Sequence, residues 1–262
     1  MCGLPTNRVV LITGASSGIG RETALAFAER GDIVCAVARR PDRLAQLHQT
    51  ARAFHLAGEI MLFPADVRDQ DEMHRIVDKV MALYGRLNVL VANAGIGQRG
   101  SIVDSKWDDL DAVLRTNLDG ALHSVRAAVP AMRRFKNGHI IFVSSVVSIA
   151  VTPYASVYAA SKAALNVLAR GLREELRPDG IWVTTMLVGQ TESEFAESRR
   201  GVPGKISAGI PTMKVHKVAD AIVQEAGRRR RVRILRPFDR ALVVAGAFFP
   251  RLLDRIAARF YR

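Results

Sequence analysis

The chain has 262 residues, of which 49% are hydrophobic and 24% charged, and its formal net charge is +13 at pH 7. This composition is typical of a globular protein with a sizeable core, and it excludes low-complexity and short-period repeat proteins. The prolines and glycines are scattered, so we expect one domain. No apolar run approaches the roughly 18 residues of a membrane span, and no signal peptide or disulfide framework is recognisable, which favours a cytoplasmic protein.

Apolar runs rich in Val and Ile alternate with amphipathic segments. The runs lack polar alternation, which is typical of parallel strands buried on both faces. The predicted strands are residues 8–13, 33–38, 60–65, 87–94, 139–145, 182–188 and 232–236, and the predicted helices are 18–30, 41–57, 69–84, 107–135, 155–177 and 215–229. This order predicts a single doubly wound, seven-stranded parallel α/β sheet that binds its ligand at the carboxyl ends of the strands.

The stretch TGASSGIG follows the first predicted strand and opens the first helix. Glycines at these positions allow a tight turn and a close approach of the backbone to a pyrophosphate at the helix N-terminus. Such turns also occur as plain connectors, but after the first strand of a βαβ unit this one predicts a dinucleotide site. The residues assigned to it are Gly14, Ser16, Ser17, Gly18, Ile19 and Gly20.

The second strand ends in Arg39 and Arg40, where an acidic residue would hold the ribose 2′-hydroxyl of NAD. Two guanidinium groups suit a 2′-phosphate, which they can bind through paired hydrogen bonds. The sequence therefore favours NADP(H) over NAD(H). The alternative is that one or both arginines point into solvent.

Two further strand ends carry turn residues. Asp66 and Val67 follow the third strand, and Asn93, Ala94 and Gly95 follow the fourth. Either group could be an ordinary turn. In this architecture Asp66 can reach the adenine edge, and the Asn93–Gly95 backbone can run close to the cofactor.

The stretch YAASK places Tyr158 and Lys162 on one helical face, because they are four residues apart. A free tyrosine with a pKa near 10 is a poor acid–base catalyst at neutral pH, and a neighbouring cation is expected to lower that pKa. A Tyr/Lys pair on a helix is often structural. Here Ser144 and Ser145 end the fifth strand, and their hydroxyls could meet the same substrate oxygen.

In this order and spacing, TGASSGIG, NAG, Asn117, Ser145 and YAASK resemble the short-chain dehydrogenase/reductase family over residues 7–237. The resemblance implies a Rossmann-type fold and a catalytic tetrad of Asn117, Ser145, Tyr158 and Lys162. It implies that Asn117 anchors a water, and that Lys162 stabilises the phenolate and holds the nicotinamide ribose. It also implies a homodimer or homotetramer, formed in part by the helices at 107–135 and 155–177.

After the sixth strand the sequence departs from the family pattern, which has Pro-Gly and then a Thr that binds the nicotinamide carboxamide. Val188 replaces the Pro, Gly189 matches, Ser193 takes the Thr position, and Thr191 lies two residues earlier. A serine hydroxyl can make the same hydrogen bond, so cofactor binding is expected to survive. Residues 190–214 are expected to form a lid over the substrate.

These features predict an NADP(H)-dependent oxidoreductase that transfers a hydride between the nicotinamide and a carbonyl or secondary alcohol, with Tyr158 as general acid/base. A lipophilic substrate is expected. The alternatives are a non-catalytic dinucleotide-binding sensor and a membrane-surface interaction protein. No metal site is predicted, because none of the six histidines stands at ligand spacing with another His or Cys.

Most of the positive charge lies in the last quarter. Residues 199–262 hold 16 Lys/Arg against 4 Asp/Glu, whereas residues 1–198 are nearly neutral. Residues 238–262 form a basic extension with an amphipathic helix after Pro250. This helix is expected to pack on its own domain, on a partner subunit, or on an anionic membrane surface. Nucleic acid is not an expected partner, because no reader motif or aromatic–basic interleaving is present.

Overall fold

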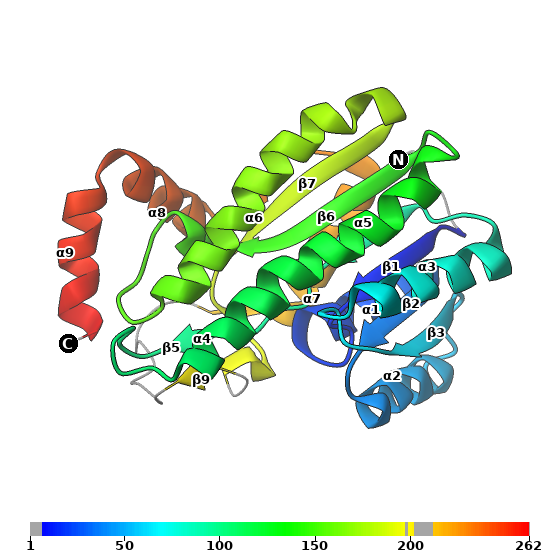
Figure 1. Cartoon of the computed structure of the whole chain (residues 1–262), viewed down its shortest axis with the longest axis horizontal. Coiled ribbons are helices and arrows are strands. Elements are labelled where there is room, and N and C mark those ends of the chain that lie inside the picture. Colours follow the sequence, from blue (N-terminus) through cyan, green and yellow to red (C-terminus); the bar gives the residue numbers. More distant parts are fainter. Residues whose placement is uncertain (1–6, 197–198, 202–211, 262) are drawn as a thin grey trace.

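The computed structural model describes residues 7–196, 199–201 and 212–261 (Figure 1). Its centre is a parallel seven-stranded sheet in the order β11-β7-β6-β4-β1-β2-β3. The strands are β1 (Val9–Thr13), β2 (Ile33–Ala38), β3 (Glu59–Pro64), β4 (Val89–Ala92), β6 (Gly138–Ser145), β7 (Ile181–Val188) and β11 (Val232–Ile234). The predicted doubly wound sheet is confirmed, and each predicted strand is present with ends that differ by at most two residues.

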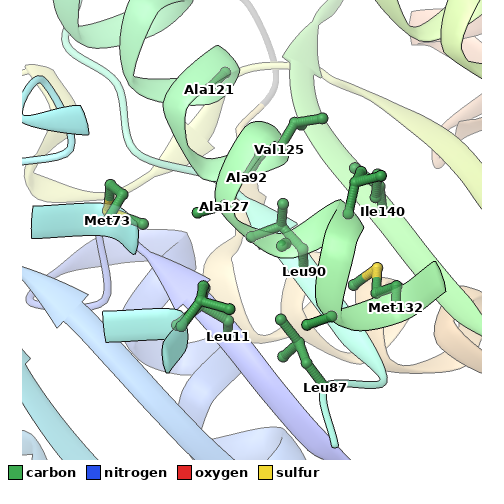
Figure 2. Packing of buried hydrophobic residues seen from close by; sticks show 14 of the residues in the cluster. Leu11, Met73, Leu87, Leu90, Ala92, Ala121, Val125, Ala127, Met132 and Ile140 are labelled. Atoms are coloured by element: carbon green, nitrogen blue, oxygen red, sulfur yellow. The ribbon is translucent and has the colours of Figure 1, made fainter. Parts of the chain in front are cut away.

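Helices cover both faces of this sheet (Figure 1). One face carries α1 (Gly18–Glu29), α2 (Pro41–Ala53) and α7 (Val215–Arg228), and the other carries α3 (Gln70–Tyr84), α5 (Gly120–Arg133) and α6 (Ser156–Glu175). Within β1, Val10 and Ile12 pack on the first group, and Val9 and Leu11 on the second. Strand side chains alternate between faces, so an unbroken apolar run fills both cores. Figure 2 shows Leu11 within the second core.

The predicted helix over residues 107–135 is not continuous. The structure has α4 (Trp107–Leu114), a π-helical turn (Arg115–Asp119) and then α5. The expectation of one α-helix was wrong at this turn. Its Asn117 is fully buried and hydrogen-bonds a distant loop, and sequence periodicity does not report such a tertiary contact. π-helical bulges are frequent at functional sites.

Beyond β11 the chain forms two helices, α8 (Pro237–Phe248) and α9 (Pro250–Tyr261). The sequence predicted only the second, because α8 is apolar almost throughout. Short strands pair at the site: β5 (Gln98–Arg99) with β9 (Arg200–Gly201), and β8 (Thr191–Glu192) with β10 (Met213–Lys214). In the part of the chain that the structure describes, no helix has the length and apolarity needed to cross a bilayer.

Candidate active site

One cavity of about 1070 Å³ lies at the carboxyl ends of the central strands. It extends from Arg39 and Arg40 at the end of β2, past Tyr158 on α6, to α8 and α9. The predicted site residues that line it are Gly14, Ser16, Ser17, Gly18, Ile19, Arg39, Arg40, Asp66, Val67, Asn93, Ala94, Gly95, Ser145, Tyr158, Lys162, Val188, Gly189, Thr191 and Ser193. Two others, Gly20 and Asn117, do not line the cavity and lie behind its wall.

The turn after β1 is held against the turn after β4. The Asn93 side-chain amide donates to the Thr13 carbonyl oxygen at 2.9 Å, and Thr13 Oγ1 accepts from the backbone N–H groups of Asn93 and Ala94, both at 3.1 Å. At Gly14, where φ is +68°, an added Cβ would lie 2.8 Å from the Ala94 Cα. The glycine is therefore required both for its backbone conformation and for this close approach.

This turn fits a pyrophosphate on structural grounds. Helix α1 begins at Gly18, and Ser17 at its N-cap makes no capping hydrogen bond through its side chain. The first N–H groups of the helix thus lie at the cavity without a side-chain cap. Gly20 serves packing, since a Cβ there would collide with the Gly14 carbonyl oxygen.

Both arginines after β2 lie at the same end of the cavity. Arg40 Nη2 donates to Ser16 Oγ at 3.1 Å and to Ser17 Oγ at 3.0 Å. Arg39 Nη1 is 3.9 Å from Asp66 Oδ2. Arg40 is therefore held over the glycine-rich turn rather than pointing freely into solvent.

Asp66 is engaged by Arg68, whose guanidinium lies 2.7 Å from Asp66 Oδ2. Partial burial alone would raise the pKa of Asp66, but the hydrogen bonds and charge of Arg68, with a smaller contribution from Arg39, hold this pKa below its usual range. The carboxylate is ionised at neutral pH. It can still accept a hydrogen bond from a ligand at the cavity wall.

The catalytic candidates come from β6 and α6. Ser145 ends β6, and its Oγ donates to the Val188 carbonyl oxygen at 3.2 Å. Lys162 Nζ donates to the Val143 carbonyl oxygen at 2.8 Å and lies 5.9 Å from the centre of the Tyr158 ring. The neighbouring Ser144 bonds the Lys162 carbonyl oxygen at 3.1 Å. Ser144 thus has a structural bond to α6, whereas Ser145 stands beside Tyr158.

Burial is the largest influence on the pKa values of Tyr158 and Lys162. It raises the pKa of Tyr158 to about 12, although a hydrogen bond with Ser145 and the positive charge of Arg199 act to lower it. Burial also lowers the pKa of Lys162 to about 8. The sequence predicted that Lys162 itself lowers the tyrosine pKa. Instead, burial raises it. Ser145 and Arg199 act in the opposite direction, and Lys162 Nζ donates to the Val143 carbonyl oxygen.

Asn117 ties the site together from behind. Its amide bonds both backbone groups of Ile96, at 2.8 and 3.0 Å, and Ser161 Oγ at 2.9 Å. A Cβ on Gly95 would lie 3.0 Å from Asn117 Oδ1 and 3.3 Å from Lys162 Nζ. The π-helical turn therefore brings the β4 loop, α5 and α6 into one packed junction beside Lys162.

Part of the expected lid can be placed. Ser193 lies over the start of α1, where a Cβ on Gly18 would be 3.4 Å from the Ser193 Cβ. Thr191 bonds the Gly189 carbonyl oxygen at 3.0 Å. Residues 197–198 and 202–211 of the expected lid lie outside the described residues. Among the residues that are described, no three His, Cys, Asp or Glu side chains are grouped as metal ligands.

Sequence reasoning missed two parts of the cavity wall. Phe195 lies over Tyr158, with ring centres 5.6 Å apart, and Arg199 lines the same region. The second part is the C-terminal extension, which contributes Phe238, Asp239, Leu242, Leu253, Ile256 and Ala257. The apolar stripe of α9 was visible in the sequence. The surface that it faces depends on the tertiary fold and was left open.

Comparison with known proteins agrees with this geometry. A family model described as short chain dehydrogenase matches residues 8–202. A 3-oxoacyl-(acyl-carrier-protein) reductase from Thermotoga maritima is 38% identical over 190 residues, covering 72% of this chain and 76% of the relative. An 11-beta-hydroxysteroid dehydrogenase-like protein of Arabidopsis thaliana is 37% identical over 225 residues, covering 85% and 71%. A solved alcohol dehydrogenase from Thermococcus sibiricus, complexed with 5-hydroxy-NADP, is similar with a TM-score of 0.75 at 27% identity, covering 86% of this chain and 93% of that one.

Proposed function

Since the chain belongs to the short-chain dehydrogenase family of oxidoreductases, we propose that it is an NADP(H)-dependent enzyme that interconverts a lipophilic carbonyl compound and its secondary alcohol. One observation carries the proposal: Ser145, Tyr158 and Lys162 line the same cavity as the glycine-rich turn. A dinucleotide bound at that turn would lead along the cavity to the tyrosine. The similarity to reductases and dehydrogenases supports this reading.

The residues of the cavity fit a dinucleotide. The uncapped start of α1 suits the pyrophosphate, and the backbone at Gly95 suits close contact with the cofactor. Arg39 and Arg40 offer two guanidinium groups for a 2′-phosphate. The Thermococcus sibiricus structure, which is complexed with 5-hydroxy-NADP, adds support for NADP(H). When bound, the nicotinamide supplies or accepts the hydride.

In the reductive direction, Ser145 and Tyr158 bind the carbonyl oxygen of the substrate. Tyr158, whose pKa burial raises to about 12, holds its proton at neutral pH and donates it to this oxygen. Donors aimed at developing negative charge stabilise the transition state. The Lys162 ammonium stabilises the phenolate that forms, and with a pKa of about 8 it can also pass on a proton. Alcohol oxidation follows the same path in reverse.

The test is Tyr158→Phe, compared with Tyr154→Phe. Tyr154 is four residues earlier in the chain and does not line the cavity. We expect Tyr158→Phe to lower kcat by at least about 10³-fold and to leave the Kd for NADPH nearly unchanged, while Tyr154→Phe behaves as the parent protein. Unchanged turnover in Tyr158→Phe would contradict the mechanism. A non-catalytic sensor would bind NADPH but would not oxidise it, whichever carbonyl compound is supplied.

Membership of this family also suggests an oligomeric state. We expect a homodimer or homotetramer that uses α4, α5 and α6, since Val167 on α6 is 67% exposed and suits a subunit contact. Sedimentation velocity measures the state. A monomer across the micromolar range would contradict this expectation.

One observation favours a second property, attachment to an anionic membrane surface. Phe248, Phe249 and Leu252, at the turn between α8 and α9, are all more than half exposed, and Arg251 is exposed beside them. Exposed aromatic and aliphatic side chains next to arginine suit the interface of an acidic bilayer. The turn lies at the edge of the molecule opposite α2 (Figure 1).

Phe248 and Phe54 form a matched pair for the test, since they are 74% and 73% exposed. Phe248 ends α8 and Phe54 follows α2, and these two helices lie on opposite sides of the molecule (Figure 1). We expect Phe248→Ser to reduce co-sedimentation with phosphatidylserine-containing vesicles, and Phe54→Ser to have no effect. Equal binding by both variants, or no binding by the parent protein, would remove the membrane property and leave the enzymatic proposal intact.

A further inference from the structure

The two ends of the cavity have different walls. The nucleotide end is formed by strand-end turns of the sheet, which are rich in glycine and polar side chains. Beyond Tyr158 much of the wall is apolar, and two segments far apart in sequence contribute apolar side chains to it, in addition to Phe195 of the lid. One is the loop after β6, with Val147, Ala150 and Val151, and the other is the C-terminal pair of helices, with Phe238, Leu242, Leu253, Ile256 and Ala257.

Helix α8 is fixed to the catalytic part of the molecule near its start. Arg236 donates to Asp239 through two hydrogen bonds of 2.7 Å, and the Asp239 side chain is 1% exposed. This ion pair lies against Gly189 at the end of β7, where an added Cβ would collide with the Asp239 carboxylate. The first turn of α8 is therefore seated directly on the strand end that borders the nicotinamide side of the cavity.

A second contact fixes the last turn of α8. A Cβ on Gly246 would lie 2.8 Å from the Ile149 carbonyl oxygen and 3.1 Å from the Ala150 Cα. The glycine thus lets the helix backbone rest on the loop that forms the opposite apolar wall. Since both contacts involve residues bordering the cavity, α8 is a structural part of the site.

Helix α9 then turns its apolar stripe to the cavity. Leu253, Ile256 and Ala257 line it, whereas Arg251, Arg255 and Arg259 are exposed. The arginines recur every four residues and mark the opposite face of the helix. Ala258 adjoins Ala257 in sequence and does not line the cavity. Ile256 remains 45% exposed, so apolar surface of the stripe is available to a bound molecule.

We propose that the α8–α9 pair is the acceptor-binding wall that sets substrate size. It selects ketones and secondary alcohols with an elongated apolar body that extends from Tyr158 toward α9. This inference rests on the proposed function, because it concerns the acceptor of the same reaction. Removing a methylene group from water at such a wall is worth roughly a three- to fourfold gain in affinity. The specificity constant for a homologous series should therefore rise with chain length until the cavity is filled.

The experiment compares Ala257→Trp with Ala258→Trp in the full chain, using methyl ketones from four to twelve carbons and NADPH. For the parent protein we expect kcat/KM to rise about threefold per methylene group. Ala257→Trp should lower the ratio of kcat/KM for long over short ketones at least tenfold, mainly through KM. Ala258→Trp should keep the parent ratio. Leu253→Ala removes apolar surface from the wall without adding bulk, so it should reduce the rise of kcat/KM with ketone length. It replaces Ala257→Trp in the test if that variant fails to fold.

A fluorescence titration measures the affinity for NADPH and, together with the kinetics, distinguishes failure of the proposed function from failure of the acceptor-wall proposal. If the parent protein binds NADPH and reduces no ketone, the proposed function fails. If the parent protein reduces ketones and Ala257→Trp and Leu253→Ala keep its length dependence, the acceptor-wall proposal fails while the enzyme stands. A tenfold or larger loss of NADPH affinity in Ala257→Trp would also overturn it, because the wall would then act on the nucleotide.

Discussion

The nucleotide end and the C-terminal end of the cavity are built in different ways. At the nucleotide end, Val9, Val10, Leu11 and Ile12 of β1 are fully buried, and the turn that follows is tied to the β4 turn by hydrogen bonds. Within α8, Asp239 is the residue that is buried, and the turn after the helix exposes phenylalanines. The family model covers the first end and stops at residue 202. A deeply buried cofactor turn and a weakly buried extension thus border the same cavity.

The sheet and the C-terminal extension each contain a buried Arg–Asp pair. The first, Arg8–Asp32, lies at the amino ends of β1 and β2, at the edge of the sheet away from the cavity. Asp32 accepts from Arg8 through the backbone N–H at 2.9 Å and through the guanidinium at 3.1 and 2.6 Å. Asp239 accepts from Arg236 with similar geometry. The pairs differ in their surroundings, because the first joins two central strands and the second fixes one terminal helix. The same chemistry should therefore have different consequences for stability.

The largest expected effect is at the centre of the site. Lys162→Met should lower kcat by about 10³-fold and at the same time stabilise the fold. Since burial lowers the pKa of Lys162 to about 8, its charge costs roughly 3 kcal/mol at pH 7, more than the roughly 1 kcal/mol of its hydrogen bond. We expect urea denaturation to show a gain of about 2 kcal/mol. A destabilised variant would contradict this account of the buried ammonium.

Removing each aspartate compares the stability of the sheet with that of the C-terminal extension. Asp32→Ala leaves the Arg8 guanidinium buried in the sheet, so we expect a loss of about 3–5 kcal/mol in the free energy of unfolding. Asp239→Ala should cost less than half as much globally. Its effect should be seen as faster hydrogen exchange confined to α8 and α9, because few buried contacts hold these helices. Equal global losses would contradict this expectation and show that the sheet and the extension unfold as one cooperative unit.

The arginines after β2 test the nucleotide end alone. We expect Arg39→Ala combined with Arg40→Ala to weaken NADPH binding by about 10- to 100-fold, because two charge-assisted contacts to a 2′-phosphate are lost. NADH binding should change little. Arg43→Ala is the control, since the Arg43 side chain is 42% exposed, pairs with Glu194 at 3.8 Å and does not line the cavity. Parallel losses for NADPH and NADH would overturn the assignment of these arginines to the 2′-phosphate.

The smallest effect is a pH dependence of stability. The lowered pKa of Lys162 means that the folded protein binds fewer protons than the unfolded chain between about pH 8 and 10.5. The penalty from this lysine is thus fully present below pH 8 and is relieved as the pH rises. The stability gain of Lys162→Met should shrink between pH 7 and pH 10. Comparing the two proteins at each pH cancels the opposing effect of Tyr158, whose raised pKa destabilises the fold at high pH.

The sequence predicted the strands and the cofactor turns because their signals are local. Unbroken Val/Ile runs identify strands buried on both faces, and TGASSGIG carries its conformational requirement in its glycines. The spacing of Tyr158 and Lys162 likewise follows from one helix. These residues do line one cavity.

What could not be predicted depends on contacts between distant segments. The π-helical turn exists where Asn117 bonds Ile96 and Ser161. The charge of Arg199, which acts against the raised pKa of Tyr158, comes from a lid segment whose position no local sequence pattern predicts. Helix α8 lacks the amphipathic periodicity by which a helix can be predicted from sequence. The stripe of α9 showed that the helix must cover something apolar, but only the fold shows that it covers its own cavity.

The reductase activity is tested by the oxidation of NADPH by the parent protein in the presence of methyl ketones of increasing length, with NADH run in parallel. We predict turnover that rises with chain length and that is at least tenfold more efficient with NADPH. Tight binding of NADPH without oxidation by any ketone would contradict the claim that this cavity is the active site of a reductase.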